Sequence, residues 1–153
     1  MQKPIVIITG CGYKSVKHVY KFNEKPTHNS IFIEGVECKM NIGTATALYL
    51  AKKKIRVIMV SRNKDSLIKI KEGLIKLGCE SNLISFIAAD LKTKDGIDYL
   101  VNNLPMNNQF YWVQSIGMGG GDYKIPNDNI YLPFEEISPE VIMAESSIVP
   151  TTH

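Results

Sequence analysis

Apolar runs alternate with amphipathic segments along the chain up to about residue 115. The continuous run Ile5-Val6-Ile7-Ile8 is rich in β-branched residues, which is typical of a strand buried on both faces of a parallel sheet. Similar runs predict further strands over 56–61, 83–88 and 110–115. Between the strands, apolar residues recur at helical spacing, which predicts helices over 41–54, 63–77 and 94–104. Strands that alternate with helices in this way indicate an α/β fold with a parallel sheet.

The turn after the first strand points to a ligand. Thr9-Gly10 ends that strand, and Asn41-Ile42-Gly43 opens a helix of small residues. Joined directly, the two pieces would form the first unit of a Rossmann-type sheet, here partial with about four strands and helices on both faces. In that unit, backbone N–H groups at a helix N-terminus hold a pyrophosphate. Gly10, Gly12 and Gly43 are the candidates for a close approach of the backbone to that group.

The segment 11–40 interrupts this turn as a long insertion. Residues 17–22 alternate in polarity and residues 30–33 are strand-like, which together predict a β-hairpin or flap. We expect the insertion to stand beside the pyrophosphate site and to protrude, covering the cofactor or contacting a second subunit. The alternative is a solvated excursion without function. A loop-rich segment, 118–153, completes what we expect to be one NAD(P)-binding domain over 1–153.

Two strand ends carry further candidates for nucleotide contacts. Ser61-Arg62 closes the second strand, where an acid would bind the 2′-hydroxyl of NAD and an arginine suits a 2′-phosphate. Asp90 follows the third strand and is a candidate acceptor for the adenine amino group, with Leu91 against the ring. The alternative for Asp90 is a helix-cap aspartate, since Thr93 follows.

These motifs together resemble the cofactor-binding N-terminal half of the short-chain dehydrogenase/reductase family. The family pattern TGxxxGxG is present with Asn41 where the second glycine is usual and with the insertion inside it. The resemblance covers about residues 4–117. It rests on the following segments: Thr9-Gly10, Asn41-Ile42-Gly43, Val60-Ser61-Arg62-Asn63 and Ala89-Asp90-Leu91.

The resemblance implies a role for each matching residue. Thr9, Gly10, Ile42 and Gly43 would line the pyrophosphate site. Ser61 and Arg62 would favour NADP, and Asp90 and Leu91 would frame the adenine. Gln114-Ser115-Ile116-Gly117 resembles the divergent fourth-strand motif of enoyl reductases in the same family. It implies that Ser115 and Gly117 contact the cofactor, with the nicotinamide near Gly117.

The chain departs from the family in its catalytic residues. The family uses a serine and a Tyr-x-x-x-Lys pair that lie after its fourth helix, where the tyrosine donates a proton. Two such strings occur here, Tyr13/Lys17 and Tyr49/Lys53, but neither is in the catalytic position. We therefore assign no catalytic residue. We expect the N-terminal part of a longer enzyme, truncated, split or cleaved, with its C-terminal remainder as a partner.

The leading hypothesis is an NADP-dependent oxidoreductase that transfers hydride to a carbonyl or an activated double bond of a small-molecule substrate. We expect a homo-oligomer. One alternative is an S-adenosylmethionine-dependent methyltransferase, because Thr9-Gly10-Cys11-Gly12 resembles the glycine turn of that family and Asp90 suits adenine there too. Against it, Ser61-Arg62 stands where an acid should bind ribose. The other alternative is a non-catalytic nucleotide-binding subunit.

Composition narrows the partners, the cellular compartment and the metals that we expect for this chain. The 153 residues contain 44% hydrophobic residues, enough for one sizeable core, and carry a net charge of only +3, so we expect no nucleic-acid partner. No apolar run reaches the roughly 20 residues that span a bilayer, so we expect no membrane partner. Three cysteines, an odd count, indicate a reducing cytoplasm. The three histidines show no metal-ligand spacing, and we assign no metal.

Overall fold

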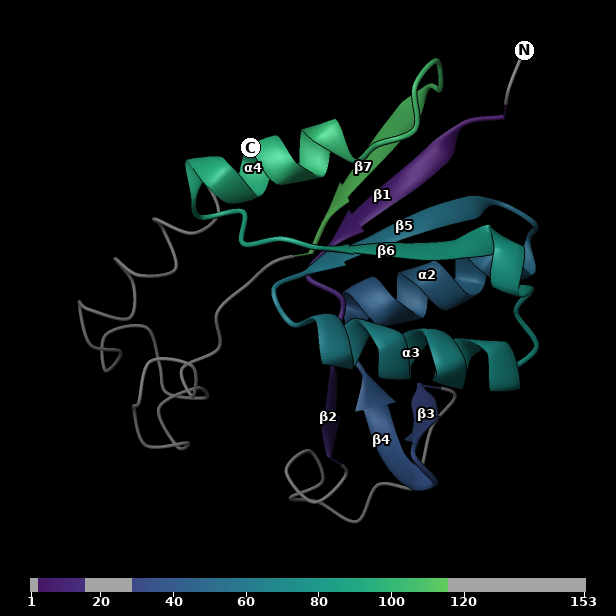
Figure 1. Cartoon of the computed structure of the whole chain (residues 1–153). Coiled ribbons are helices and arrows are strands. Elements are labelled where there is room, and N and C mark those ends of the chain that lie inside the picture. Colours follow the sequence, from purple (N-terminus) through teal and green to yellow (C-terminus); the bar gives the residue numbers. More distant parts are fainter. Residues whose placement is uncertain (1–2, 16–28, 116–153) are drawn as a thin grey trace, which may run out of the picture. The chain divides into compact units, whose positions relative to one another are not determined.

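The computed structural model describes residues 3–15 and 29–115 (Figure 1). All of them belong to one compact unit, Met1–Ser115. The predicted strand over 17–22 and the loop-rich segment 118–153 lie outside the described residues. The expectation of a single domain over 1–153 therefore stays a prediction.

A four-stranded parallel sheet forms the centre of this unit, with the strand order β6-β5-β1-β7. Its strands are β1 (Ile5–Thr9), β5 (Arg56–Ser61), β6 (Ile84–Ala88) and β7 (Phe110–Gln114). All four strands predicted from the apolar runs are confirmed. The central strand β1 pairs with β5 on one side and β7 on the other, which explains why all five of its residues are buried.

Helices cover both faces of the sheet, as predicted. The helices α2 (Ile42–Lys52) and α3 (Lys64–Lys76) lie on one face, and α4 (Lys94–Asn102) lies on the other (Figure 1). A short 3₁₀ turn, Ser81–Leu83, precedes β6. The parallel sheet with helices on both faces confirms the predicted α/β fold of Rossmann type.

None of the described helices is long and apolar enough to cross a membrane.

The insertion forms a second, three-stranded antiparallel sheet with the order β2-β4-β3. Its strands are β2 (Tyr13–Ser15), β3 (Ser30–Ile33) and β4 (Val36–Met40). The predicted strand over 30–33 is confirmed, but its described hairpin partner is β4, which the sequence analysis did not predict. Glu34 and Gly35 both have positive φ, 51° and 82°, as a two-residue type I′ turn requires. This two-residue turn, and not a long loop, therefore connects the two strands of the hairpin.

The described part of the insertion packs against α3. Ile31 and Ile33 are buried, and Glu34 forms an ion pair with Lys69 of α3 at 3.5 Å. At Gly73, in the middle of α3, a Cβ atom would lie 2.7 Å from Cγ1 of Ile31. Such a close approach of β3 to α3, together with the buried Cys38 and Met40 of β4, is incompatible with a solvated excursion or a free flap, so these two expectations are wrong for β3 and β4. Contact with a second subunit stays a prediction.

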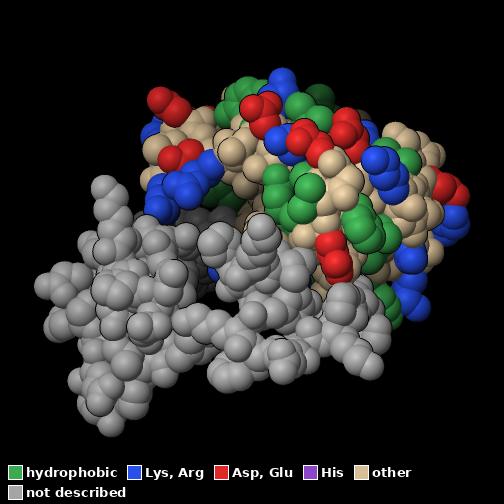
Figure 2. Space-filling view, turned by 90° about the horizontal axis from the view of Figure 1, so that it is seen from below, with side chains coloured by type: hydrophobic (Ala, Val, Ile, Leu, Met, Phe, Trp, Pro, Cys, Tyr) green, Lys and Arg blue, Asp and Glu red, His purple; other side chains and the backbone are tan. Residues whose placement is uncertain are grey.

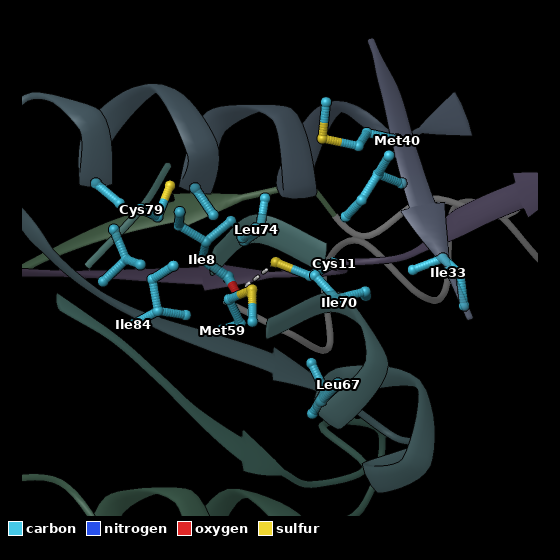
Figure 3. Packing of buried hydrophobic residues seen from close by; sticks show 14 of the residues in the cluster. Ile8, Cys11, Ile33, Met40, Met59, Leu67, Ile70, Leu74, Cys79 and Ile84 are labelled. Carbon is cyan, nitrogen blue, oxygen red and sulfur yellow. Dashed lines mark hydrogen bonds between the residues drawn. The ribbon is translucent and has the colours of Figure 1, made fainter. Parts of the chain in front are cut away.

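One hydrophobic cluster joins the parallel sheet, α2, α3 and the insertion (Figure 3). The sheet contributes the side chains on the face toward α2 and α3, and the insertion contributes Ile31, Ile33, Cys38 and Met40. The insertion is thus an extension of the hydrophobic core.

Seen from the side of the small sheet, the surface mixes basic and acidic side chains, and the described residues show no large patch of one sign there (Figure 2).

Candidate nucleotide-binding site

The strand order reverses beside β1. From β1 the chain runs outward through β5 and β6, and it then returns to the other side of β1 to form β7. In open α/β sheets, ligands bind outside the carboxyl ends of the strands where the order reverses. Here that place lies between the ends of β1 and β7. The residues that follow these strands, Gly10 and Ser115, and the first turn of α2 meet there.

Gly43 marks the closest approach at this point. A Cβ atom on Gly43 would lie 2.5 Å from Oγ of Ser115 and 3.1 Å from the carbonyl oxygen of Gly10. Any larger residue would therefore force Ser115, the Gly10 turn or α2 to shift. Gly10 has φ of +78°, a conformation that favours glycine. The structure therefore brings together three residues that the sequence singled out: Gly10, Gly43 and Ser115.

Asn41 caps α2 and ties it to the glycine turn. Its Oδ1 accepts hydrogen bonds from the backbone N–H of Thr44 at 3.0 Å and of Gly12 at 3.1 Å. Its Nδ2 donates to the carbonyl oxygen of Gly10 at 2.7 Å. Asn41 is a candidate cofactor-binding residue in the sequence, where it replaces the second glycine of the motif, but this tie to Gly10 and Gly12 was not predicted. The signal available was an asparagine before a helix, which is a preferred N-cap.

Two backbone donors at the start of α2 remain available to a ligand. Among the described residues, the N–H groups of Ile42 and Gly43 have no hydrogen-bond partner, whereas the N–H of Gly12 is engaged by Asn41 and by Oγ1 of Thr44 at 2.9 Å. The first turn of α2 contains no acidic residue. Free N–H groups and the positive end of the helix dipole together favour an anion. Gly12 thus shapes the turn, and its N–H is already taken.

Ser61 and Arg62 stand at the same edge of the sheet. β5 lies next to β1, and the N–H of Gly10 donates to the carbonyl oxygen of Val60 at 2.9 Å. Ser61 is half-buried and Arg62 is exposed. None of the described residues forms an ion pair with Arg62. Within the described part of the chain its guanidinium is thus unpaired, as the NADP hypothesis requires.

Asp90 and Leu91 follow β6 in a short turn. Oδ1 of Asp90 accepts from the N–H of Lys92 at 3.0 Å, and its carbonyl oxygen accepts from Oγ1 of Thr93 at 2.9 Å. Thr93, and not Asp90, caps α4 by accepting from the N–H of Gly96. Leu91 is buried. The carboxylate is thus held at the sheet edge by its own turn, and its predicted contact with adenine stays a prediction.

The glycine turn also holds a buried thiol. Burial raises the pKa of the Cys11 thiol from 9.0 to about 12, and its Sγ lies 3.6 Å from the carbonyl oxygen of Ile8 (Figure 3). Cys38 and Cys79 are also free thiols whose pKa burial raises. At neutral pH Cys11 is therefore uncharged. It adds no negative charge beside an anion site and is no candidate nucleophile.

The remaining candidates lie elsewhere. Tyr49 and Lys53 are at the C-terminal end of α2, opposite the glycine turn, and Nζ of Lys53 lies 5.0 Å from the centre of the Tyr49 ring. Lys17, Gly117 and all three histidines are outside the described residues. Within the described residues, no three histidine, cysteine, aspartate or glutamate side chains group closely enough to hold a metal ion.

The comparisons with known proteins connect this geometry to one fold. No family model matches the sequence, and no curated protein matches it. Solved structures do match. A short-chain dehydrogenase from Mycobacterium smegmatis is 14% identical, with a TM-score of 0.58 over 99% of this chain and 50% of that protein. A short-chain dehydrogenase from Bacillus anthracis is 17% identical, with a TM-score of 0.57 over 95% of this chain and 43% of that protein.

A third match is the F189W variant of actinorhodin polyketide ketoreductase, solved with NADPH. It is 16% identical, with a TM-score of 0.56 over 98% of this chain and 45% of that protein. Identities this low show the fold and not the activity. The predicted resemblance is thus confirmed at the level of the fold, which is that of short-chain dehydrogenases. The chain spans about half the length of the solved proteins that it matches.

Proposed function

We propose that this chain is the cofactor-binding part of an NADP-dependent oxidoreductase of the short-chain dehydrogenase/reductase type. The observation that carries the proposal is the close approach of Gly43 to Gly10 and Ser115 at the point where the strand order reverses. The N–H groups of Ile42 and Gly43 next to it have no partner among the described residues, and the first helical turn contains no acid. A pyrophosphate is the ligand that these features suit best.

Arg62 supports NADP over NAD within this proposal. It follows β5 directly, is exposed, and has no described ion-pair partner. A hydrogen bond between a guanidinium and a phosphate contributes about 1.5–3 kcal/mol, which corresponds to at least about tenfold in affinity. Ser61 adds a hydroxyl donor beside it. The NADPH bound to the similar ketoreductase is consistent with the same choice.

In this proposal each part of the site has a separate task. Ile42 and Gly43 bind the pyrophosphate, and Arg62 binds the 2′-phosphate. Asp90 and Leu91 would frame the adenine, and Ser115 and Gly117 are the proposed contacts of the nicotinamide. The cofactor supplies a hydride for a carbonyl or an activated double bond. The described residues offer no assigned proton donor, so we propose that catalysis needs residues beyond 115.

Titration with NADPH and NADH tests the proposal. We expect wild-type chain to bind NADPH at least about tenfold more tightly, and Arg62→Ala to lose most of this preference. Arg56→Ala is the matched control, because Arg56 is an exposed arginine at the opposite end of the same strand. Equal affinities for the two cofactors, or the same loss in both variants, would reject the assignment of Arg62.

The methyltransferase alternative is tested in the same titration. Such an enzyme should carry an acid after β5 to bind the ribose hydroxyls, and this chain carries Arg62. Tight binding of S-adenosylmethionine with no response to NADPH would favour the alternative. The non-catalytic subunit differs from the leading proposal only when the complete enzyme is assayed with NADPH.

A further inference from the structure

The insertion leaves the glycine turn and returns to it at one place. The backbone N–H of Asn41 donates to the carbonyl oxygen of Gly12 at 3.1 Å, and Tyr13 pairs with Met40 in the antiparallel sheet. Residues 29 positions apart in the sequence thus face each other where the phosphate turn should be continuous. The shape of this turn depends on non-covalent contacts, because no short covalent link joins its two halves.

Two side chains from the start of α2 supply those contacts. Asn41 reaches the carbonyl oxygen of Gly10 with Nδ2 and the N–H of Gly12 with Oδ1. Oγ1 of Thr44, which is fully buried, lies 2.9 Å from the nitrogen and 2.8 Å from the oxygen of Gly12. Neither side chain engages the N–H groups of Ile42 and Gly43.

We propose that Asn41 and Thr44 form a clasp that positions the glycine turn for nucleotide binding. The clasp is defined as the hydrogen bonds from these two side chains to Gly10 and Gly12. The inference rests on the proposed function, because its purpose is the pyrophosphate site. Asn41 and Thr44 are positioning residues here: they act on the turn and leave the ligand to Ile42 and Gly43.

The chemistry of the clasp favours an anion next to it. A carbonyl oxygen carries a partial negative charge that repels a phosphate, and donation from Nδ2 of Asn41 offsets this charge at Gly10. Oδ1 of Asn41 accepts hydrogen bonds from the N–H groups of Gly12 and Thr44. It therefore leaves the N–H groups of the first two helical residues, Ile42 and Gly43, to a ligand. Glycine residues have little conformational preference of their own, so a turn built from Gly10 and Gly12 needs such ties.

The variant Asn41→Ser keeps the helix cap but removes the hydrogen bonds from this side chain to Gly10 and Gly12. Serine still caps a helix by accepting from the third N–H, but it is too short to reach Gly10 and Gly12 together. Asn63→Ser is the matched control for the loss of a cap, because Asn63 caps α3 by accepting from the N–H of Ser66 at 3.1 Å and makes no other side-chain hydrogen bond to a described residue. We expect Asn41→Ser to bind NADPH about tenfold more weakly and Asn63→Ser to bind it as wild type does. Asn41→Ser should also melt below Asn63→Ser, because it loses two further hydrogen bonds.

A second readout needs no cofactor. The N–H of Gly12 has two acceptors, one on Asn41 and one on Thr44, and its hydrogen exchange can be followed by NMR in the full chain. Thr44→Val keeps the shape of the side chain and removes the hydroxyl. We expect the Gly12 amide to exchange about tenfold faster in the double variant Asn41→Ser, Thr44→Val than in wild type.

The outcomes separate the clasp from the proposed function. Faster exchange at Gly12 together with weaker NADPH binding supports the proposal. Unchanged exchange in the double variant overturns the clasp, and faster exchange with unchanged NADPH affinity overturns its positioning role. If the wild-type chain does not bind NADPH but the Gly12 amide still exchanges faster in the double variant, the hydrogen bonds of the clasp are supported and the proposed function is wrong.

Discussion

Gly73 offers a test of whether the insertion belongs to the core, because two effects of opposite sign meet there. Replacing a glycine inside a helix by alanine normally stabilises by about 1 kcal/mol. In this structure the new Cβ would lie 2.7 Å from Cγ1 and 2.8 Å from Cδ1 of Ile31, and 3.1 Å from the carbonyl oxygen of Phe32. Ile31 is fully buried, and at these distances its side chain or the backbone has to shift.

The balance of these two effects predicts the sign of the change in unfolding free energy. Overpacking of a buried contact costs about 1–3 kcal/mol. After the gain of about 1 kcal/mol in helix propensity is subtracted, Gly73→Ala should be neutral to about 2 kcal/mol destabilising. Urea denaturation of the wild-type and variant chains measures this difference. A variant that is about 1 kcal/mol more stable than wild type would refute the packing of the insertion against α3.

Removing Ile31 provides the internal control. Ile31→Ala alone should cost about 2–5 kcal/mol because it empties a buried site. In that background Gly73→Ala no longer meets Cγ1 and Cδ1 of Ile31 and keeps only the contact of 3.1 Å with the carbonyl oxygen of Phe32, so it should become neutral or stabilising. A double-mutant cycle with a coupling of more than about 1 kcal/mol is therefore expected. Additive effects would show that the two positions do not touch.

Two further predictions concern the thiols and the chemistry. Burial raises the pKa of Cys11 from 9.0 to about 12, so this thiol should stay unreacted with iodoacetamide at pH 8 in the folded chain, with denatured chain as the reactive control. Because the unfolded state releases the Cys11 proton first, its contribution to the unfolding free energy is fully present below pH 9 and is lost toward pH 12; Cys11→Ala should flatten this fall. Chain confirmed by mass to end at His153 should bind NADPH but reduce no carbonyl substrate, because a positioned proton donor commonly contributes about 10²–10⁴ in rate. Robust turnover by that material would show that Tyr13 or another residue acts as the donor.

The elements of the parallel sheet could be predicted from sequence because each is determined locally. A strand such as Ile5–Thr9 that is buried on both faces needs a continuous apolar run, and the helices needed only spacing and caps. The hairpin of β3 and β4 was missed although Val36–Met40 alternates, with Cys38 and Met40 buried. Its turn, Glu34-Gly35, has a glutamate at positive φ, which sequence preferences do not favour.

The clasp and the packing of the insertion depend on contacts between residues that are distant in the sequence. That Asn41 reaches Gly10 and Gly12 follows only once both ends of the insertion meet. One local signal was available for the packing: an isolated glycine, Gly73, inside a helical pattern, which usually has a packing reason. The candidates Gly10, Gly43 and Ser115 lie together because the glycine motif and the strand ends share one edge of the sheet, while their contact with a cofactor stays a prediction.

The most direct test of the central claim is backbone amide NMR of the full chain during titration with NADPH. The account predicts saturable binding in which the amides of Ile42 and Gly43 shift most among α2 residues, while the engaged Thr44 amide shifts less. It also predicts that NADH shifts the same amides only at higher concentration. Absence of any shift at Ile42 and Gly43 at saturating NADPH, or shifts confined to another part of the molecule, would contradict the account.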